Sequence, residues 1–367
     1  TLTWEKVTTL DLGLDARFFN DALGVTFDWY NRTTSDILTT ANLPATLGAD
    51  APYENMGTIQ TKGWELAIDY RHTFKNGLHF GVTASVADDK TEVTKWTYNT
   101  KIPSYGATGW WDKSAYKEGM VLGDIWGLQF DRFLTEDDFN ADGSLKAGLP
   151  DQTKVFPAGY QFAPGDVLYK DLDNNGEIVK QTNTNDKGDL SVIGNALPRL
   201  QFGLNLDAAW KGFDISMFFQ GVAKRKLWAA GNQVLPGFTT GEPFYKGAED
   251  YWTPENTDAF YPRPMDYKQS ASGNYSVNDR YLLNMAYLRL KTFTVGYSLP
   301  KVWLSKFKVQ GLRVYFTGEN LFTIDGVKPA IDPEIGIRTA SGKSDQRNFG
   351  RSYPYQKTVS FGIQLSL

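Results

Sequence analysis

Apolar and polar residues alternate along much of the chain with a period of two. Residues 10–18 read LDLGLDARF: every even position is apolar, and the odd positions hold Asp11, Gly13, Asp15 and Arg17. Because successive side chains of an extended strand point to opposite faces, this pattern predicts a strand with one apolar and one polar face. The same alternation marks eight further segments: 22–32, 63–71, 78–87, 201–211, 213–221, 286–298, 309–319 and 356–367. The sequence therefore predicts an all-β protein with about nine strands.

One of these segments changes phase along its length. In 286–298, Leu288 and Leu290 occupy even positions, whereas Phe293 and Val295 occupy odd ones. An extra residue in one strand produces such a shift. We therefore expect a β-bulge near Lys291.

The connections between the strands alternate between short and long. Turn residues at 19–21, 75–77 and 211–212 separate adjacent strands and predict tight hairpins, and 299–308 is a medium connection. The long connections are 33–61, 90–198, 225–283 and 320–355. We expect short turns at one rim and long loops at the other. Segment 122–131 also alternates. If it were a further spanning strand, it would reverse the direction of every later strand across the membrane. We therefore assign it to the excursion 90–198, as part of a hairpin.

Three features favour a transmembrane β-barrel over a soluble β-sandwich. The strands are about 10 residues long, which suits a tilted bilayer crossing. Aromatic residues such as Phe18, Phe19 and Trp210 gather beside the short turns, as in a membrane-interface girdle. Full charges also occur in mid-strand on the polar face. We expect these charges to line a wet lumen, and the apolar face of residues 10–18 to meet lipid. The lumen candidates are Asp11, Asp15, Arg17, Asp28, Glu65, Asp69 and Arg71.

The number of strands indicates that the barrel is larger than this chain. Short turns of outer-membrane barrels are periplasmic and long loops extracellular, so the strand after 320–355 should end in the periplasm. Nine spanning strands cannot complete a bacterial barrel, because such barrels have even numbers of strands. We therefore interpret residues 1–367 as the C-terminal portion of a larger antiparallel barrel, with 90–198 and 225–283 as extracellular excursions.

Composition and motifs narrow the function classes. The chain has 38 basic and 42 acidic residues and a net charge of −4, which gives no electrostatic reason to expect nucleic acid. It contains no cysteine, hence no disulfide or thiolate metal site. No apolar run approaches the roughly 20 residues of a transmembrane helix. We find no phosphate-binding glycine loop, nucleophile elbow or metalloprotease helix, and we expect no enzymatic activity.

A calcium loop is the most specific chemical motif. In DLDNNGEI (171–178), Asp171, Asp173 and Asn175 occupy alternate positions, a glycine follows, and Glu177 would ligate through its backbone carbonyl. Position 12 is Thr182 instead of the usual glutamate, so Asp186 or Asp189 would have to complete the site. The alternative is an exposed turn rich in Asp and Asn. No cofactor is required, and the expected role of Ca²⁺ is to stiffen the loop.

Aromatic residues are frequent in the long loops. They could stack on sugar rings, anchor a partner protein or simply pack within the loops, and the sequence does not choose among these roles. The binding candidates are Trp110, Trp111, Trp126, Trp228 and Trp252, with Tyr105, Tyr245, Tyr251 and Tyr261 nearby.

Several long blocks resemble one transporter family. The blocks are LTWEKVTTLDLGLDARFFNDALGVTFDWYNRTTSDIL (2–38), GNALPRLQFGLNLDAAWKGFDISMFFQGV (194–222), YLLNMAYLRLKTFTVGYSLPKVW (281–303), GENLFTI (318–324) with DPEIG (332–336), and YPYQKTVSFGIQLSL (353–367). Together they resemble the SusC/RagA family of TonB-dependent outer-membrane transporters of Bacteroidetes. The resemblance implies a 22-stranded barrel and a SusD-like surface lipoprotein that acts as a lid. It also implies a plug domain, a TonB box and N-terminal strands outside this chain, and the lumen candidates would then contact the plug or line the path.

The resemblance also implies a function. We expect energy-coupled import of an oligosaccharide or peptide across the bacterial outer membrane, with this chain supplying barrel wall and lid-facing or substrate-facing loops. The expected partners are the lipoprotein, the rest of the barrel and plug, TonB, lipid and the substrate. The main alternative is a soluble or surface-anchored glycan-binding β protein. A passive porin, which would lack a plug, is a third possibility.

Overall fold

We describe the protein from a computed structural model of the whole chain. The structure describes residues 2–40, 52–97, 117–180, 187–229, 231–238, 244–265, 273–305, 309–328, 331–334, 339–340, 343–344 and 355–366. Statements about contacts refer to these residues.

A single antiparallel sheet of nine strands dominates the molecule, as the alternation predicts. We call this sheet the wall. Its strands, in spatial order, are β1 (Lys6–Phe18), β2 (Leu23–Thr40), β3 (Tyr53–Thr73), β4 (His79–Trp96), β9 (Arg199–Trp210), β10 (Phe213–Lys224), β13 (Tyr287–Ser298), β14 (Gly311–Asp325) and β17 (Thr358–Ser366). Spatial order follows chain order throughout, so every neighbouring pair is a hairpin or a hairpin interrupted by a long excursion.

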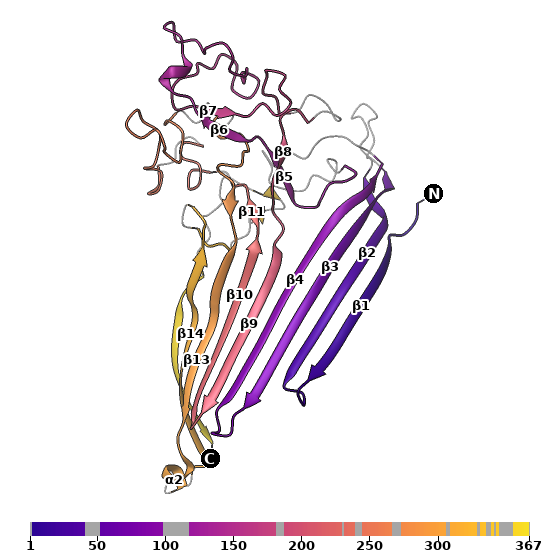
Figure 1. Ribbon diagram of the computed structural model, residues 1–367, viewed down its shortest axis with the longest axis vertical. Coiled ribbons are helices and arrows are strands. Elements are labelled where there is room, and N and C mark those ends of the chain that lie inside the picture. The colour runs from indigo at the N-terminus through magenta and orange to yellow at the C-terminus, as the bar shows by residue number, and fades with distance from the viewer. Residues whose placement is uncertain are drawn as a thin grey trace.

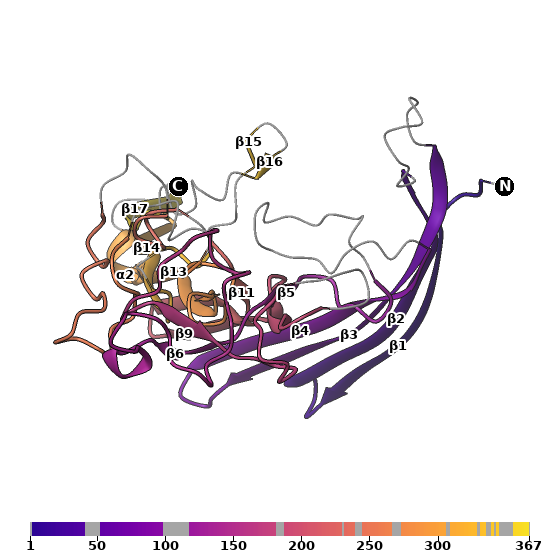
Figure 2. The ribbon, with the colours of Figure 1, turned by 90° about the horizontal axis from the view of Figure 1, so that it is seen from above.

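The wall is a curved and open structure. In Figure 1 its long tilted strands run between a rim of short turns and a rim of long loops, and the C-terminus lies at the turn rim. Seen from above, the sheet forms an arc, with β1 and β17 at its two edges (Figure 2). This shape is that of a partial barrel.

Backbone geometry explains the tight turns. Trp210 pairs with Phe213, so Lys211 and Gly212 alone close the hairpin. Their φ angles are 49° and 90°, as a two-residue turn that follows the right-handed strand twist requires. The connection at 299–308 instead contains the short helix α2 (Lys301–Leu304).

The predicted bulge in β13 is present. Phe218 pairs with Thr292 and the next residue, Phe219, pairs with Leu290, so Lys291 is the extra residue. The register between β13 and β14 shifts at the same place. The bulge therefore accounts for the phase change in the apolar pattern.

The strands extend further toward the loop rim than the alternation predicts. β2 continues to Thr40, β3 begins at Tyr53 and β4 ends at Trp96, so the predicted loop boundaries in 33–61 and at residue 90 are wrong. β14 likewise continues to Asp325. Where both faces of a sheet meet water, backbone pairing can continue without an apolar face to mark it.

The long connections fold into an outer lobe, which we define as the described residues of 117–198 and 225–285. Segment 122–131 lies here, as expected: β5 (Asp124–Gly127) pairs with β8 (Ser191–Asn195), and β6 (Phe130–Phe133) pairs with β7 (Val167–Tyr169). The remaining short elements are η3 (Glu136–Asp138), β11 (Lys226–Leu227), β12 (Leu283–Asn284), β15 (Thr339–Ala340) and β16 (Lys343–Ser344). No helix in the described ranges is both long and apolar enough to span a membrane.

Two hydrophobic cores hold the outer lobe together. One contains Leu128, Tyr169 and Trp252, and the other contains Trp228 and Leu283, among others. Each core joins residues from both excursions, which are far apart in the sequence. The lobe is therefore a packed body and not a set of independent loops.

Candidate functional site

The lumen candidates all lie on one face of β1, β2 and β3. The strand register aligns Gly13, Asp28 and Glu65 in one row and Arg17, Gly24 and Asp69 in another. Asp11, Asp15 and Arg71 follow at intervals of two residues along the same face. This shared face fits the lumen prediction, which stays a prediction.

An ion pair crosses this polar face over a glycine. Nη1 of Arg17 on β1 lies 2.7 Å from Oδ2 of Asp69 on β3, although β2 runs between them. A Cβ atom on Gly24 would overlap both side chains, so glycine leaves the space for the pair. Asp214 on β10 and Arg313 on β14 pair in the same way across Gly296, with Nε to Oδ1 at 3.0 Å.

The polar face is hollowed near the middle of the wall. A depression of about 510 Å³ extends over β2, β3, β4, β9 and β10, and Asp28, Glu65, Gln201 and Gln220 contribute to its lining. These polar groups suit a water-filled path or a polar ligand.

The opposite face of the wall carries exposed apolar side chains. Leu12, for example, is 59% exposed in mid-strand. Other exposed members of the two-residue pattern are Leu10, Leu14, Phe18, Val314, Val359, Phe361, Ile363 and Leu365. Exposed rings also occur near the short turns, at Phe19, Phe74, Trp210 and Phe213. Large exposed apolar surfaces mark contact with lipid or protein, and a lipid-facing belt is the one the sequence predicts.

The predicted binding aromatics have different environments. Trp228 is 1% exposed and Trp252 is also buried, so both rings fill cores, in line with the packing alternative. Trp126 packs beside a core and is partly buried. Trp110 and Trp111, like Tyr105, lie outside the described residues.

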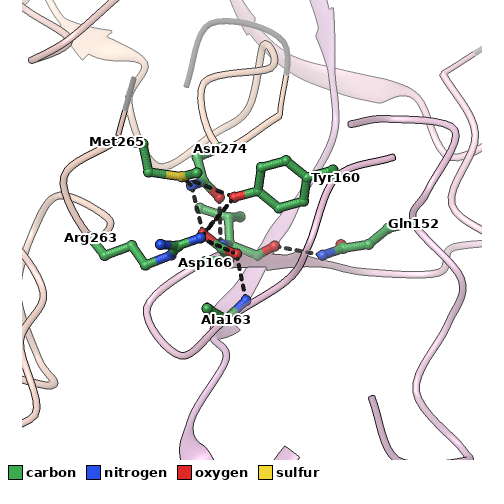
Figure 3. A network of polar contacts seen from close by, with 8 residues as sticks. Gln152, Tyr160, Ala163, Asp166, Arg263, Met265 and Asn274 are labelled. Atoms are coloured by element: carbon green, nitrogen blue, oxygen red, sulfur yellow. Dashed lines mark hydrogen bonds and ion pairs between the residues drawn. The ribbon is translucent and has the colours of Figure 1, made fainter. Parts of the chain in front are cut away.

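A buried carboxylate joins the two excursions of the outer lobe. Asp166 is fully buried and accepts hydrogen bonds from Tyr160 Oη at 2.9 Å, Arg263 Nε at 2.8 Å and Asn274 Nδ2 at 3.0 Å. The backbone N–H of Ala163 donates to its other oxygen at 2.9 Å. Figure 3 shows these groups converging on the carboxylate. Because its donors lie up to 108 residues away in the sequence, no local motif indicated a role for Asp166.

A second ion pair lies within the first excursion. Arg132 donates two hydrogen bonds to the Asp138 carboxylate, at 2.6 and 2.7 Å. These hydrogen bonds lower the pKa of Asp138 to about 2. The carboxylate also accepts from the backbone of Thr135, which caps η3.

A charged cluster joins the wall to the segment 331–334. Arg289 contacts both Asp332 at 2.7 Å and Glu334 at 3.1 Å, and Lys291 at the bulge contacts Glu334 at 2.9 Å. All but Lys291 are buried side chains. The motif DPEIG (332–336) was noted for its family resemblance, but the sequence did not indicate that its acidic residues contact Arg289.

The acidic loop brings together a somewhat different set of side chains from the predicted one. Carboxylate oxygens of Asp171, Asp173 and Asp189 lie within 4.8 Å of one another. The side-chain oxygen of Asn175 accepts a hydrogen bond from Glu177 N, and the Glu177 carboxylate pairs with Lys154. Thr182 and Asp186 lie outside the described residues. Of the two predicted completing residues, Asp189 is therefore the one that can be placed at the cluster.

Comparison with known proteins identifies the family of the wall. Residues 1–321 match the model of the TonB dependent receptor-like β-barrel. The chain belongs to this family. TonB-dependent receptor barrels are outer-membrane proteins and transporters, not enzymes.

The curated relatives of this TonB-dependent receptor barrel include proteins of two bacteria. TonB-dependent receptor P3 of Formosa agariphila is 28% identical over 99% of the chain, which spans 34% of that relative. TonB-dependent receptor SusC of Bacteroides thetaiotaomicron is 24% identical over 100% of the chain and 32% of that relative. The chain thus spans about a third of the length of these relatives.

A solved structure has the same fold. The structure of the RagAB peptide transporter superposes with a TM-score of 0.70 at 21% identity, covering 99% of this chain and 35% of that one. The sequence-based prediction of a SusC/RagA-type partial barrel is confirmed.

Proposed function

We propose that the chain forms part of the wall and the outer lobe of a TonB-dependent importer of nutrients in a bacterial outer membrane. The nine-stranded wall carries the argument: one face bears exposed apolar side chains and the other bears charges, in a barrel of the receptor family. In this proposal the apolar face meets lipid, and the charged face lines the path or contacts the plug.

The proposed partners follow from the family resemblance. A plug, further strands and TonB would belong to the complete transporter, and a SusD-like lipoprotein would cover the outer lobe. The relative named SusC and the structural neighbour RagAB, described as a peptide transporter, support a nutrient of the oligosaccharide or peptide class. In this proposal the packed lobe is the part of the chain that the lid covers.

The exposed apolar face also bears on the alternative of a soluble glycan-binding protein. Such a protein would hold this face in water, which is unfavourable at roughly 25 cal/mol per Å². A passive porin would keep the wall but import without TonB. An energy-dependence experiment separates the porin from the proposed importer.

The decisive experiment is deletion of the complete gene, followed by uptake assays with defined oligosaccharides and peptides. We expect uptake of one class to fall at least tenfold, to return with the gene, and to fall equally when TonB is removed. Unchanged uptake of every nutrient would overturn the proposal. Uptake that needs the gene but not TonB would indicate a porin.

We also propose that the loop around Asp171 binds calcium. Oδ1 of Asp171 is buried and has no hydrogen-bond partner among the described residues, and the carboxylate of buried Asp189 lies in the same cluster. Three carboxylates are a suitable oxygen donor set for this hard cation. Bound Ca²⁺ would stiffen the loop.

Calorimetry with Ca²⁺ tests this site in the full-length protein. We expect Asp189→Asn to weaken binding at least tenfold. The matched control is Asp142→Asn, since Asp142 forms a similar turn with Ser144 but belongs to no acidic cluster within the described part of the chain. Equal binding by the wild type and the Asp189 variant would refute the proposal.

A further inference from the structure

A pocket opens in the outer lobe, away from the polar hollow of the wall. Its volume is about 500 Å³, within the range of ligand sites in proteins. All of its described lining belongs to the excursion 225–283. The lining comprises Pro236, Phe244, Tyr245, Lys246, Ala248, Glu249, Tyr251, Tyr261, Pro262, Pro264 and Tyr275.

Two buried tyrosines give the pocket a fixed base. Tyr261 stacks on Tyr281 with 6.0 Å between ring centroids, and its hydroxyl donates to the backbone oxygen of Val234 at 2.9 Å. Tyr275 packs edge-on against the same Tyr281 ring at 5.2 Å. These contacts hold the base in place before any ligand arrives.

Tyr275 adds a hydroxyl group to the base of the pocket. The residue is only 4% exposed, yet it lines the pocket. A tyrosine hydroxyl group can both donate and accept a hydrogen bond, so it can pair with a polar group of a ligand that enters the pocket. The pocket therefore offers a specific hydrogen bond as well as apolar surface.

The outer part of the pocket combines aromatic and charged side chains. Phe244 is 61% exposed, and Tyr245 and Tyr251 are also exposed. Lys246 and Glu249 add one charge of each sign, and neither forms an ion pair with a described residue. Exposed rings of this kind lose little conformational entropy when they bind a ligand.

The chemistry of the lining favours a peptide over a sugar. A sugar carries hydroxyl groups on its whole perimeter, and each needs a hydrogen-bond partner when it is buried. Here the three prolines contribute no N–H group, and the Tyr261 hydroxyl already donates to Val234. Aromatic-lined grooves are instead suited to extended peptides, and the backbone and termini of such a peptide would meet Lys246 and Glu249.

We propose that this pocket binds an apolar side chain of a peptide captured on the outer surface. The inference rests on the proposed import function and names its substrate class. Tyr275 would donate to a backbone carbonyl of the peptide, and the rings of Tyr245 and Tyr251 would enclose the side chain.

The test uses the purified full-length transporter in detergent and a library of hexapeptides. Each peptide is alanine except at one central position, which is varied through all amino acids, and maltohexaose serves as the sugar probe. We expect the protein to retain peptides with Pro, Leu, Phe or Tyr at the varied position. Tyr245→Ala should weaken this binding at least tenfold, and Tyr275→Phe, which keeps the ring, about threefold or more.

The control variant is Tyr53→Ala, which removes an exposed ring at the start of β3, outside the pocket. It should bind the peptides as the wild type does. The inference would be overturned if peptide retention did not depend on the varied residue, or if all protein variants retained the peptides equally. So would maltohexaose binding that Tyr245→Ala abolishes.

The same variants separate this inference from the proposed function. If gene deletion abolishes import while the pocket variants bind and import normally, the pocket inference fails and the import function stands. If the pocket variants lose peptide binding but gene deletion leaves all uptake unchanged, the import function fails and the binding site stands.

Discussion

The wall and the outer lobe use apolar residues in opposite ways. In the wall, large side chains such as Leu12 and Phe361 are exposed on one face, and paired backbones hold the strands together. In the lobe, rings such as Trp228 are buried in two cores, and Asp166 is buried with its donors. The wall is thus suited to lipid, whereas the lobe is built like a water-soluble domain. Four predictions test this difference.

Asp166→Ala should have the largest effect. It leaves Arg263 half-buried without its carboxylate, and breaking such a pair is unfavourable by about 3–5 kcal/mol. Hydrogen exchange and limited proteolysis of the full-length protein should show the lobe opening while the wall stays protected. Asp142→Ala, at an exposed turn of the same lobe, is the control. Unchanged protection of the lobe would mean that the Asp166 network does not hold it together.

Leu12→Arg should destabilise the wall by about 2–4 kcal/mol, the effect of a cation at mid-bilayer on the lipid face. The neighbouring Asp11→Arg places the same charge on the opposite face and should have little effect. Denaturant titration in phospholipid vesicles measures both. Equal effects would contradict the assignment of the two faces.

Acid should weaken the lobe through Asp138. Its pKa falls from an ordinary value of 3.8 to about 2 in the folded state, so its contribution is complete above about pH 4 and is lost as the pH falls toward 2. Because Arg132 is partly exposed, we expect a loss of about 1 kcal/mol. The resistance of the lobe to proteolysis, measured as a function of pH, reports this loss. The lobe of Asp138→Asn should be less stable than that of the wild type at neutral pH, and its stability should depend less on pH between about 4 and 2. Parallel pH profiles of the variant and the wild type would contradict the assignment of this pH dependence to Asp138.

The pair of Arg17 and Asp69 should have the smallest effect. It lies on an exposed polar face, so a double-mutant cycle with alanine should give a coupling of about 0.2–1 kcal/mol that decreases with salt. Vesicle-folding titrations provide the four free energies. A coupling above about 2 kcal/mol would show that the plug or other strands shield this face.

The sequence predicted the wall well because its signal is local. Period-two alternation follows directly from strand geometry, and even the extra residue at Lys291 left a phase change. The signal ended before the strands did: residues 33–40 continue β2 without an apolar face. Backbone pairing alone extends these strands, and it leaves no side-chain pattern.

The outer lobe was less predictable because its contacts are non-local. Asp166 and Arg263 are 97 residues apart, and neither belongs to a motif. Tyr245, Tyr251 and Tyr261 were recognised as loop aromatics, but nothing in the sequence separated these pocket residues from Trp228 in a core. The acidic loop was recognised by its spacing, and Asp189 was one of its two suggested completing residues.

The space above Gly24 predicts that three positions of the wall vary together among relatives. The missing side chain of this glycine makes room for Arg17 and Asp69, so the three positions form one unit although each lies on a different strand. In an alignment of this family, a relative with a larger residue at position 24 should have lost at least one of the two charges. Gly296 with Asp214 and Arg313 gives an independent second case in the same molecule. Such three-way covariation would reveal the strand order of a barrel wall without any structure.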